Sequence, residues 1–242
     1  MAKAVGGKNV FGHAIGILML KSRFPRIPGD VGNATTWNFP VLYKVIENAT
    51  PDAVVRKGGR GLLPSFIKGA KELEKEGVRA ITTTCGFLAL FQQRIAAAVN
   101  VPVFTPSLMQ IPLVYTMLKP SQKVGIITIY AEALTQRHLS SVGVDKVPHV
   151  ILGTEGEEEF SRAILNDEME LDVEKSRNEL VKTARKMISD YSEVGAIVLE
   201  CTNMPPHAAA IQQEIGLPVF DIYTLANMVY QAVVRRKFSG YM

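Results

Sequence analysis

The chain contains two cysteines, Cys85 and Cys201, and their surroundings repeat. Each cysteine follows a short apolar run, and each is followed 17 residues later by a proline (Pro102 and Pro218) and then by Val-Phe. A thiol between a strand end and a helix start lies near the free N–H groups and partial positive charge of the helix, which lower its pKa. The pattern therefore predicts two reactive thiols in equivalent places.

Two thiols that face each other across one cleft can carry out two-base proton transfer. One thiolate removes a proton from a carbon next to a carboxylate, and the opposite thiol returns a proton to the other face. The outcome is inversion at carbon without a cofactor. Nearby hydroxyl, amide and N–H groups would bind the carboxylate and its enolate-like intermediate. The candidates for this role are Asn33, Thr83, Thr84, Gly86, Thr128, Thr202 and Asn203.

Other polar residues near these motifs have a structural interpretation beside the functional one. Arg26, Arg56 and Arg60 could bind a second carboxylate bidentately, although a single arginine is more often a surface residue. Glu200 precedes Cys201, so strand alternation points it to the opposite side as a packed or paired carboxylate. His207 is interpreted as a capping or surface imidazole rather than a functional group. A buried core position is the corresponding alternative for either cysteine.

Short apolar runs alternate with longer amphipathic stretches along the chain, which is typical of βαβ units in an α/β fold with parallel sheets. The expected strands are 15–20, 53–55, 80–83, 101–104, 124–129, 149–152, 196–199 and 218–220. The expected helices are 62–76, 87–99, 107–118, 132–141, 173–191, 206–215 and 225–237.

The repeat extends beyond the cysteines. Ile15-Gly16-Ile17 matches Val124-Gly125-Ile126, so each half opens with an apolar-Gly-Ile strand and later carries a strand–Cys–helix–Pro-Val-Phe unit. We therefore expect two similar Rossmann-like lobes, residues 14–121 and 122–234, related by a pseudo-twofold axis. Ligands of open parallel sheets bind beyond the carboxyl ends of the strands, where both cysteines lie, so the active site is expected in the cleft between the lobes.

Composition excludes several classes of protein. The 242 residues are 47% hydrophobic and 21% charged, as in globular proteins, and 27 basic residues against 23 acidic ones form no basic stripe for nucleic acid. No apolar run approaches the roughly 18 residues of a membrane span, and no secretory signal is evident, so a cytoplasmic protein is expected. The four histidines lack metal-ligand spacing and no phosphate loop occurs, so neither a metal nor a nucleotide cofactor is expected.

Two motifs resemble those of the aspartate/glutamate/hydantoin racemase superfamily, over about residues 15–234. They are Thr83-Thr84-Cys85-Gly86 and Leu199-Glu200-Cys201-Thr202-Asn203-Met204-Pro205. The resemblance implies two Rossmann-like lobes, cofactor-independent racemisation by Cys85 and Cys201, and a homodimer. The second motif departs from the Cys-Thr-His of glutamate racemases and is similar to the maleate isomerase and arylmalonate decarboxylase branch. Those decarboxylases carry glycine in place of the first cysteine.

Three hypotheses follow from these patterns. The first is a cofactor-free racemase of an amino acid or related α-chiral carboxylate or hydantoin, an isomerase that uses Cys85 and Cys201 as its two acid/base groups. The second is cis–trans isomerisation of a maleate-type dicarboxylate through covalent addition of a cysteine. The third is a non-catalytic protein that binds a small anion. In each case the expected partners are a small carboxylate-bearing molecule and a second copy of the chain.

Overall fold

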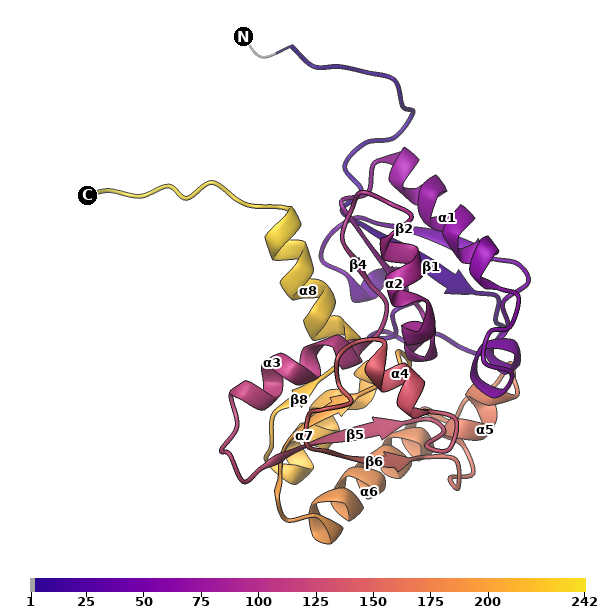
Figure 1. The fold of residues 1–242 in the computed structure, drawn as a ribbon, viewed down its shortest axis with the longest axis vertical. Coiled ribbons are helices and arrows are strands. Elements are labelled where there is room, and N and C mark those ends of the chain that lie inside the picture. The colour runs from indigo at the N-terminus through magenta and orange to yellow at the C-terminus, as the bar shows by residue number, and fades with distance from the viewer. Residues whose placement is uncertain (1–2) are drawn as a thin grey trace.

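The computed structural model describes residues 3–242, which form two α/β lobes stacked one above the other (Figure 1). Each lobe has a four-stranded parallel sheet, in the order β2-β1-β3-β4 in the N-terminal lobe and β6-β5-β7-β8 in the C-terminal lobe. The strands are β1 (Ile15–Leu20), β2 (Val41–Ile46), β3 (Ala80–Thr83), β4 (Val103–Phe104), β5 (Lys123–Thr128), β6 (His149–Gly153), β7 (Val194–Leu199) and β8 (Val219–Phe220). The predicted α/β fold with two similar lobes is confirmed.

Helices cover both sheets. The α-helices are α1 (Leu63–Glu76), α2 (Gln92–Ala96), α3 (Ile111–Thr116), α4 (Gln136–Ser140), α5 (Phe160–Leu165), α6 (Val173–Asp190), α7 (Ala208–Ile215) and α8 (Ile222–Val233). The shorter turns are η1 (Ala34–Thr36), η2 (Asp52–Arg56), η3 (Gly86–Phe91), η4 (Ser107–Gln110) and η5 (Pro205–His207). Side-chain caps fix two helix starts, since Asp172 accepts from the Lys175 amide and Asp221 accepts from the Thr224 amide.

The two sheets repeat down to single residues. Gly16 in β1 and Gly125 in β5 are equivalent, and each lies under the longest helix of its own lobe, α1 or α6. A Cβ on Gly16 would lie 3.0 Å from Leu73 of α1, and one on Gly125 would collide with Met187 of α6. A side chain at either place would displace a side chain of the helix that packs on the strand.

Seven of the eight expected strands occur near their predicted places, but the prediction of a strand at 53–55 is wrong. Pro51 starts a turn of π-helix there, η2, and its apolar side chains are buried as part of that turn. The edge strand of the N-terminal sheet is instead β2, which is hydrogen-bonded to β1. The sequence analysis did not predict β2 or α5.

Two helices cross between the lobes. In Figure 1, α8 lies beside the N-terminal lobe, and its residues Ile222 and Leu225 share a buried cluster with Ile15, Ile17 and Phe104. In return, α3 packs near β5 of the C-terminal lobe. The division into residues 14–121 and 122–234 stays a prediction, and the two lobes exchange their last helices across it.

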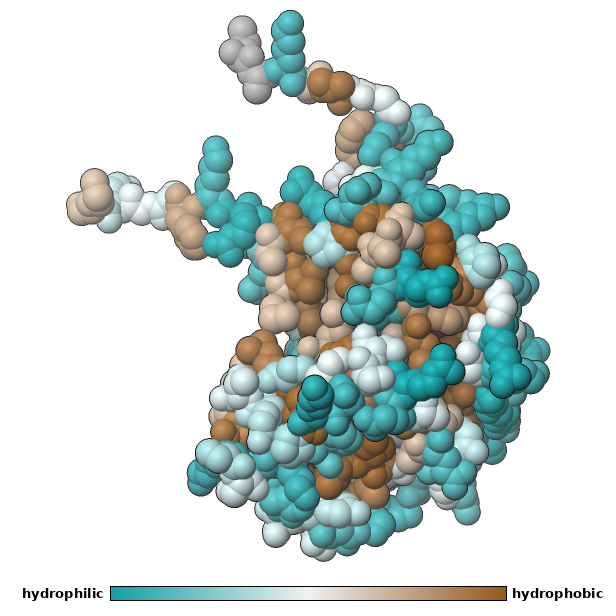
Figure 2. All heavy atoms as spheres, in the orientation of Figure 1, coloured by the Kyte–Doolittle hydropathy of each residue, from teal (hydrophilic) through white to brown (hydrophobic). Residues whose placement is uncertain are grey.

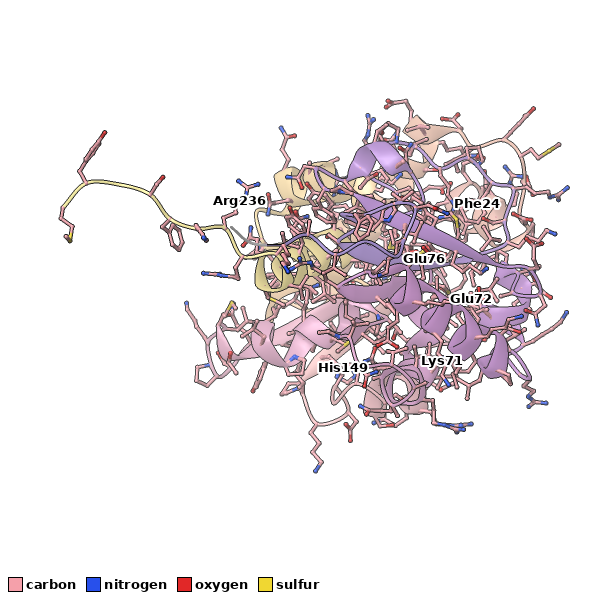
Figure 3. The ribbon with its side chains drawn as sticks, turned by 90° about the horizontal axis from the view of Figure 1, so that it is seen from above. Phe24, Lys71, Glu72, Glu76, His149 and Arg236 are labelled. Carbon is pink, nitrogen blue, oxygen red and sulfur yellow. The ribbon has the colours of Figure 1, made fainter. Side chains whose placement is uncertain are left out.

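The outer surface is polar over much of its area. Figure 2 shows teal side chains over much of the face drawn, with patches of brown apolar side chains in both the upper and the lower part of the molecule. Figure 3 shows Lys71, Glu72 and Glu76 along α1, a helix that carries charged side chains of both signs. Within residues 3–242, no helix combines the length and the apolar character that crossing a bilayer requires.

Candidate active site

A cavity lies between the lobes and contains both cysteines. Residues from both lobes line it, and they are Leu20, Phe24, Pro51, Val55, Thr84, Cys85, Gly86, Phe87, Ile129, Ile164, Leu165, Glu200, Cys201, Thr202 and Asn203. Its upper and lower walls are equivalent segments of the repeat, one after β3 and one after β7. The carboxyl ends of the two central strands therefore bring the two thiols to one place, as the repeat predicted.

Both thiols are buried and their local contacts differ. Cys85 stands directly before η3, and the amide groups of Phe87 and Leu88 point to its sulfur. Cys201 lies after β7, and its Sγ donates to Asn203 Oδ1 at 3.4 Å. The motifs also bind each other across the interface, because the Thr202 hydroxyl donates to the Thr84 carbonyl at 2.8 Å.

Burial works against ionisation of both thiols. It raises the pKa of Cys85 to about 12, assisted by the charge of Glu200 and opposed by the amides of Phe87 and Leu88. Burial and the same carboxylate raise the pKa of Cys201 well above its usual value. The expectation that the helix starts lower these pKa values is therefore wrong for the unliganded protein, since loss of solvent outweighs the N–H groups. A positive charge brought by a ligand would reverse part of this effect.

Glu200 is the charged residue of the cavity, and it is completely buried. Its Oε2 accepts from the Thr128 hydroxyl at 2.8 Å, whereas its Oε1 has no hydrogen-bond partner among residues 3–242. A Cβ on Gly86 would collide with Oε1, so this oxygen reaches from the C-terminal lobe to the first cysteine motif. Burial raises the pKa of Glu200 to about 7, and the Thr128 hydrogen bond opposes that rise. Sequence alternation did not predict that Glu200 lines the cavity.

A second layer of polar contacts holds Asn203. Its Nδ2 donates to Asp30 Oδ2 at 2.6 Å, and Asp30 also accepts from Arg26 at 2.8 Å. Arg26 in turn stacks on the ring of Phe24, with 4.6 Å between its guanidinium carbon and the ring centroid. The turn-rich segment after β1 is thus tied to the second cysteine motif.

The structure brings four of the seven predicted binding residues to the cavity and leaves three outside its lining. Thr84, Gly86, Thr202 and Asn203 line it. Thr83 instead donates to the carbonyl groups of Cys85 and Thr105. Asn33 caps η1 and donates to the Arg26 carbonyl, and the Thr128 hydroxyl is directed to Glu200. These three do not line the cavity because their side chains are engaged by neighbouring turns, strand ends and Glu200.

Neither the candidate arginines nor His207 lines the cavity. Arg26 is occupied by Asp30, and Arg56 donates to Asn166 Oδ1 at 3.1 Å. Arg60 is exposed, and His207 is buried with its ring edge-on to Phe160. Because His207 is buried, its interpretation as a surface residue is wrong. Burial also lowers the pKa of His207 to about 4.

The cavity is closed by contacts between the lobes. Its volume is about 20 Å³, which is room for about one water molecule. Next to the lining residue Phe24, the Arg23 and Phe24 amides donate to Asp167 Oδ1 of the other lobe at 2.5 and 3.3 Å. Asp167 has φ 56°, the one positive φ of a non-glycine residue in the described chain. A substrate therefore requires the loop that carries Phe24, or the lobes themselves, to move.

Comparison with known proteins agrees with this architecture. The family model described as Asp/Glu/Hydantoin racemase matches residues 56–227, more than half of the chain. The chain belongs to this family. Allantoin racemase from Klebsiella pneumoniae has the same fold, with a TM-score of 0.61, 16% sequence identity, and coverage of 90% of this chain and 86% of that one.

Within the racemase family, the curated relatives have another activity. The chain is 28% identical over 234 residues to dimethylsulfoniopropionate lyase of Durusdinium sp. clade D, covering 93% of this chain and 77% of that protein. It is 28% identical over 239 residues to dimethylsulfoniopropionate lyase 7 of Emiliania huxleyi (strain CCMP1516), covering 91% of this chain and 67% of the relative.

These relatives correct the predicted activity. The sequence analysis expected an amino-acid racemase, which is an isomerase, whereas the relatives are C–S lyases by name. The motifs predicted the wrong activity because racemisation and elimination next to a carboxylate begin with the same step, removal of a proton from the α-carbon. Residues that perform this step do not reveal what happens to the carbanion afterwards.

Proposed function

We propose that this protein is a lyase that cleaves a C–S bond in dimethylsulfoniopropionate or a closely similar short sulfonium carboxylate. The observation that carries the proposal is the similarity to dimethylsulfoniopropionate lyases along 93% of the chain. The cavity supports it in chemical terms, because thiols, a buried carboxylate and hydroxyl groups meet within apolar walls. Such a site suits proton removal from a weak carbon acid with exclusion of water.

The reaction is a β-elimination. A base takes the proton from the carbon next to the substrate carboxylate, the C–H electron pair forms the new C=C bond, and the C–S pair leaves with sulfur. The products are acrylate, neutral dimethyl sulfide and the protonated base. Sulfur departs without needing a proton, since it leaves a positively charged sulfonium as a neutral sulfide. A single base therefore suffices, in contrast to the two bases of racemisation.

Cys85 is the better placed of the two thiols to act as this base. The amides of Phe87 and Leu88 and the charge of Arg26 favour its thiolate, whereas only the Asn203 amide favours that of Cys201. The Cys201 proton is directed to Asn203, which favours the neutral thiol. Cys201 then lines the cavity as a neutral thiol whose proton is held by Asn203. The Thr84 hydroxyl, which accepts from the Leu20 amide, keeps its own proton for the substrate carboxylate.

The experiment is direct. Purified protein is incubated with dimethylsulfoniopropionate in heavy water, with dimethyl sulfide measured in the headspace and acrylate by NMR. Wild type is expected to release both products in equal amounts. Cys85→Ser is expected to lose about 10²–10⁴-fold in turnover, the usual contribution of a general base, and Cys201→Ser less. Absence of both products from wild type contradicts the lyase proposal. If Cys201→Ser is inactive while Cys85→Ser is active, Cys201 and not Cys85 is the base.

The assembly and location of the protein remain predictions. We expect a homo-oligomer in the cytoplasm, as the sequence analysis did. Exposed apolar side chains on α3, just after it and on α8, namely Leu113, Met117 and Met228, support an association of copies. Measurement of the mass in solution tests it.

A further inference from the structure

The unpaired oxygen of Glu200 is the feature of the cavity that proton removal by Cys85 does not use. A buried carboxylate oxygen normally accepts a hydrogen bond, because leaving it unpaired costs free energy. Here Thr128 satisfies Oε2, while Oε1 has no partner among the described residues and lies against Gly86 on the cavity wall. Because the cavity holds about one water molecule, a ligand group reaches this oxygen only when the cavity widens, and a side chain at residue 86 would occupy the same place.

No positive charge from the described chain reaches this oxygen. None of residues 3–242 that line the cavity is a lysine or an arginine, and Arg26 is bound to Asp30. His138 packs edge-on against Phe87 of the wall, but burial lowers its pKa to about 4, so it is neutral near pH 7. The negative charge of Glu200 thus lacks a counter-charge within the protein.

The walls around Glu200 suit a cation that has no N–H groups. The rings of Phe24 and Phe87 line the cavity together with the aliphatic side chains of Leu20, Val55 and Ile164. Aromatic faces attract quaternary ammonium groups through their quadrupole, and methyl groups on a cation bury well against aliphatic carbon. A methylated onium group makes both kinds of contact and places its charge next to a carboxylate.

We propose that Glu200 binds the positively charged end of the substrate and thereby selects short carboxylates that carry a methylated onium group at the β position. The inference rests on the proposed function, since it assigns the sulfonium of that substrate to this residue. With the sulfonium at Glu200, the carbon next to the substrate carboxylate lies toward the thiols. Glu200 is then a substrate-binding residue that sets specificity, and Thr128 and Gly86 are positioning residues that hold and make room for it.

The bound cation also assists the base. Glu200 raises the pKa of both thiols when it is ionised, and a cation beside it cancels that effect. The titratable and charged groups that face Glu200 are the thiols of Cys85 and Cys201, with the Asp30–Arg26 pair beyond them. Both thiols stay protonated near pH 7, so carboxylate ionisation alone is expected to control cation binding there.

A pair of isosteric ligands tests the proposal without any turnover. The probes are 3-(trimethylammonio)propionate and 4,4-dimethylpentanoate, which have the same shape and carboxylate but differ by one positive charge. Their dissociation constants are measured by calorimetry at pH 8 for wild type and Glu200→Gln. The matched control is Glu214→Gln, which removes the same charge from an exposed ion pair with Arg185 outside the cavity.

The expected result is a change of about tenfold or more in the ratio of the two dissociation constants, with Glu200→Gln losing preference for the charged probe. Glu214→Gln is expected to keep the wild-type ratio. The wild type measured at pH 5.5 provides the same test without a substitution, because Glu200 is then protonated and the preference is expected to fall. An unchanged ratio in Glu200→Gln overturns the inference, and so does an unchanged wild-type ratio at pH 5.5.

This result is independent of the lyase assay. A wild type that prefers the cationic probe through Glu200 but releases no dimethyl sulfide contradicts the proposed reaction and leaves the cation site in place. A wild type that releases dimethyl sulfide but shows the same ratio as Glu200→Gln supports the reaction and overturns the cation site.

Discussion

Replacing Glu200 with glutamine is expected to stabilise the protein in a pH-dependent way. The native state keeps Glu200 protonated up to about pH 7, whereas the unfolded chain releases this proton near 4.5. Between these values the native state binds more protons than the unfolded state, so stability falls as the pH rises, and the full penalty is present above pH 7. Each tenfold change in the dissociation constant is worth about 1.4 kcal/mol, so the penalty amounts to about 3 kcal/mol.

Glutamine keeps the shape of the protonated side chain and does not ionise. Glu200→Gln is therefore expected to exceed wild type by about 3 kcal/mol in free energy of unfolding at pH 8, and to match it near pH 4.5. In a domain of this size the difference at pH 8 corresponds to about 6–12 °C in melting temperature. The full figure applies because the side chain is completely buried and is not screened by solvent.

Urea denaturation at pH 4.5, 6, 7 and 8 measures the difference for Glu200→Gln, with Glu214→Gln as the exposed control. The control removes a surface ion pair and is expected to shift stability by less than about 1 kcal/mol at every pH. A difference between Glu200→Gln and wild type that is the same at all four pH values would refute the reasoning, as would a variant that is less stable at pH 8. A stabilised variant with weakened cation binding is the usual sign that a site residue lowers stability for function.

Three further substitutions test close contacts at the cavity, under α6 and between the lobes. Gly86→Ala puts a methyl group against Glu200 Oε1 and is expected to lower stability by about 1–3 kcal/mol and to abolish cation preference, measured by urea denaturation and by the probe pair. Gly125→Ala, which meets α6 far from the cavity, is expected to lower stability similarly while the ratio of the probes stays at its wild-type value. Asp167→Ala removes the acceptor of the Arg23 amide and leaves alanine at a positive φ. The variant is expected to lose about 1–3 kcal/mol in free energy of unfolding, measured by thermal unfolding. An unchanged melting temperature would contradict the assigned contact between the lobes.

Local pattern accounts for what the sequence predicted correctly. The repeat places Gly16 with Gly125 and Cys85 with Cys201, and each pair occupies equivalent places in the two sheets. Alternation of apolar and polar residues and helix-start signals act over a few residues, so they are visible without tertiary structure. They were sufficient for the fold class, most of the strands and the convergence of two thiols.

The same patterns do not reveal which segments meet across the lobes. Strand alternation predicted that Glu200 points away from the cavity. In the structure its Oε1 lies against Gly86, a residue more than a hundred positions earlier that leaves space because it has no side chain. Asp167 accepts hydrogen bonds from Arg23 and Phe24 of the other lobe, and α8 packs on the sheet of the N-terminal lobe. Contacts of this kind depend on how the two lobes dock, and no local signal encodes the docking.

The sequence by itself thus determined two repeated α/β lobes and the meeting of two cysteines between them. Only the tertiary structure decided that burial keeps these thiols protonated and that Thr83, Asn33 and Thr128 serve other residues. It also decided that a carboxylate without a partner faces the cavity. The physical reason is that pKa values and free hydrogen-bonding atoms depend on the removal of water, which takes place only when both lobes close over the same space.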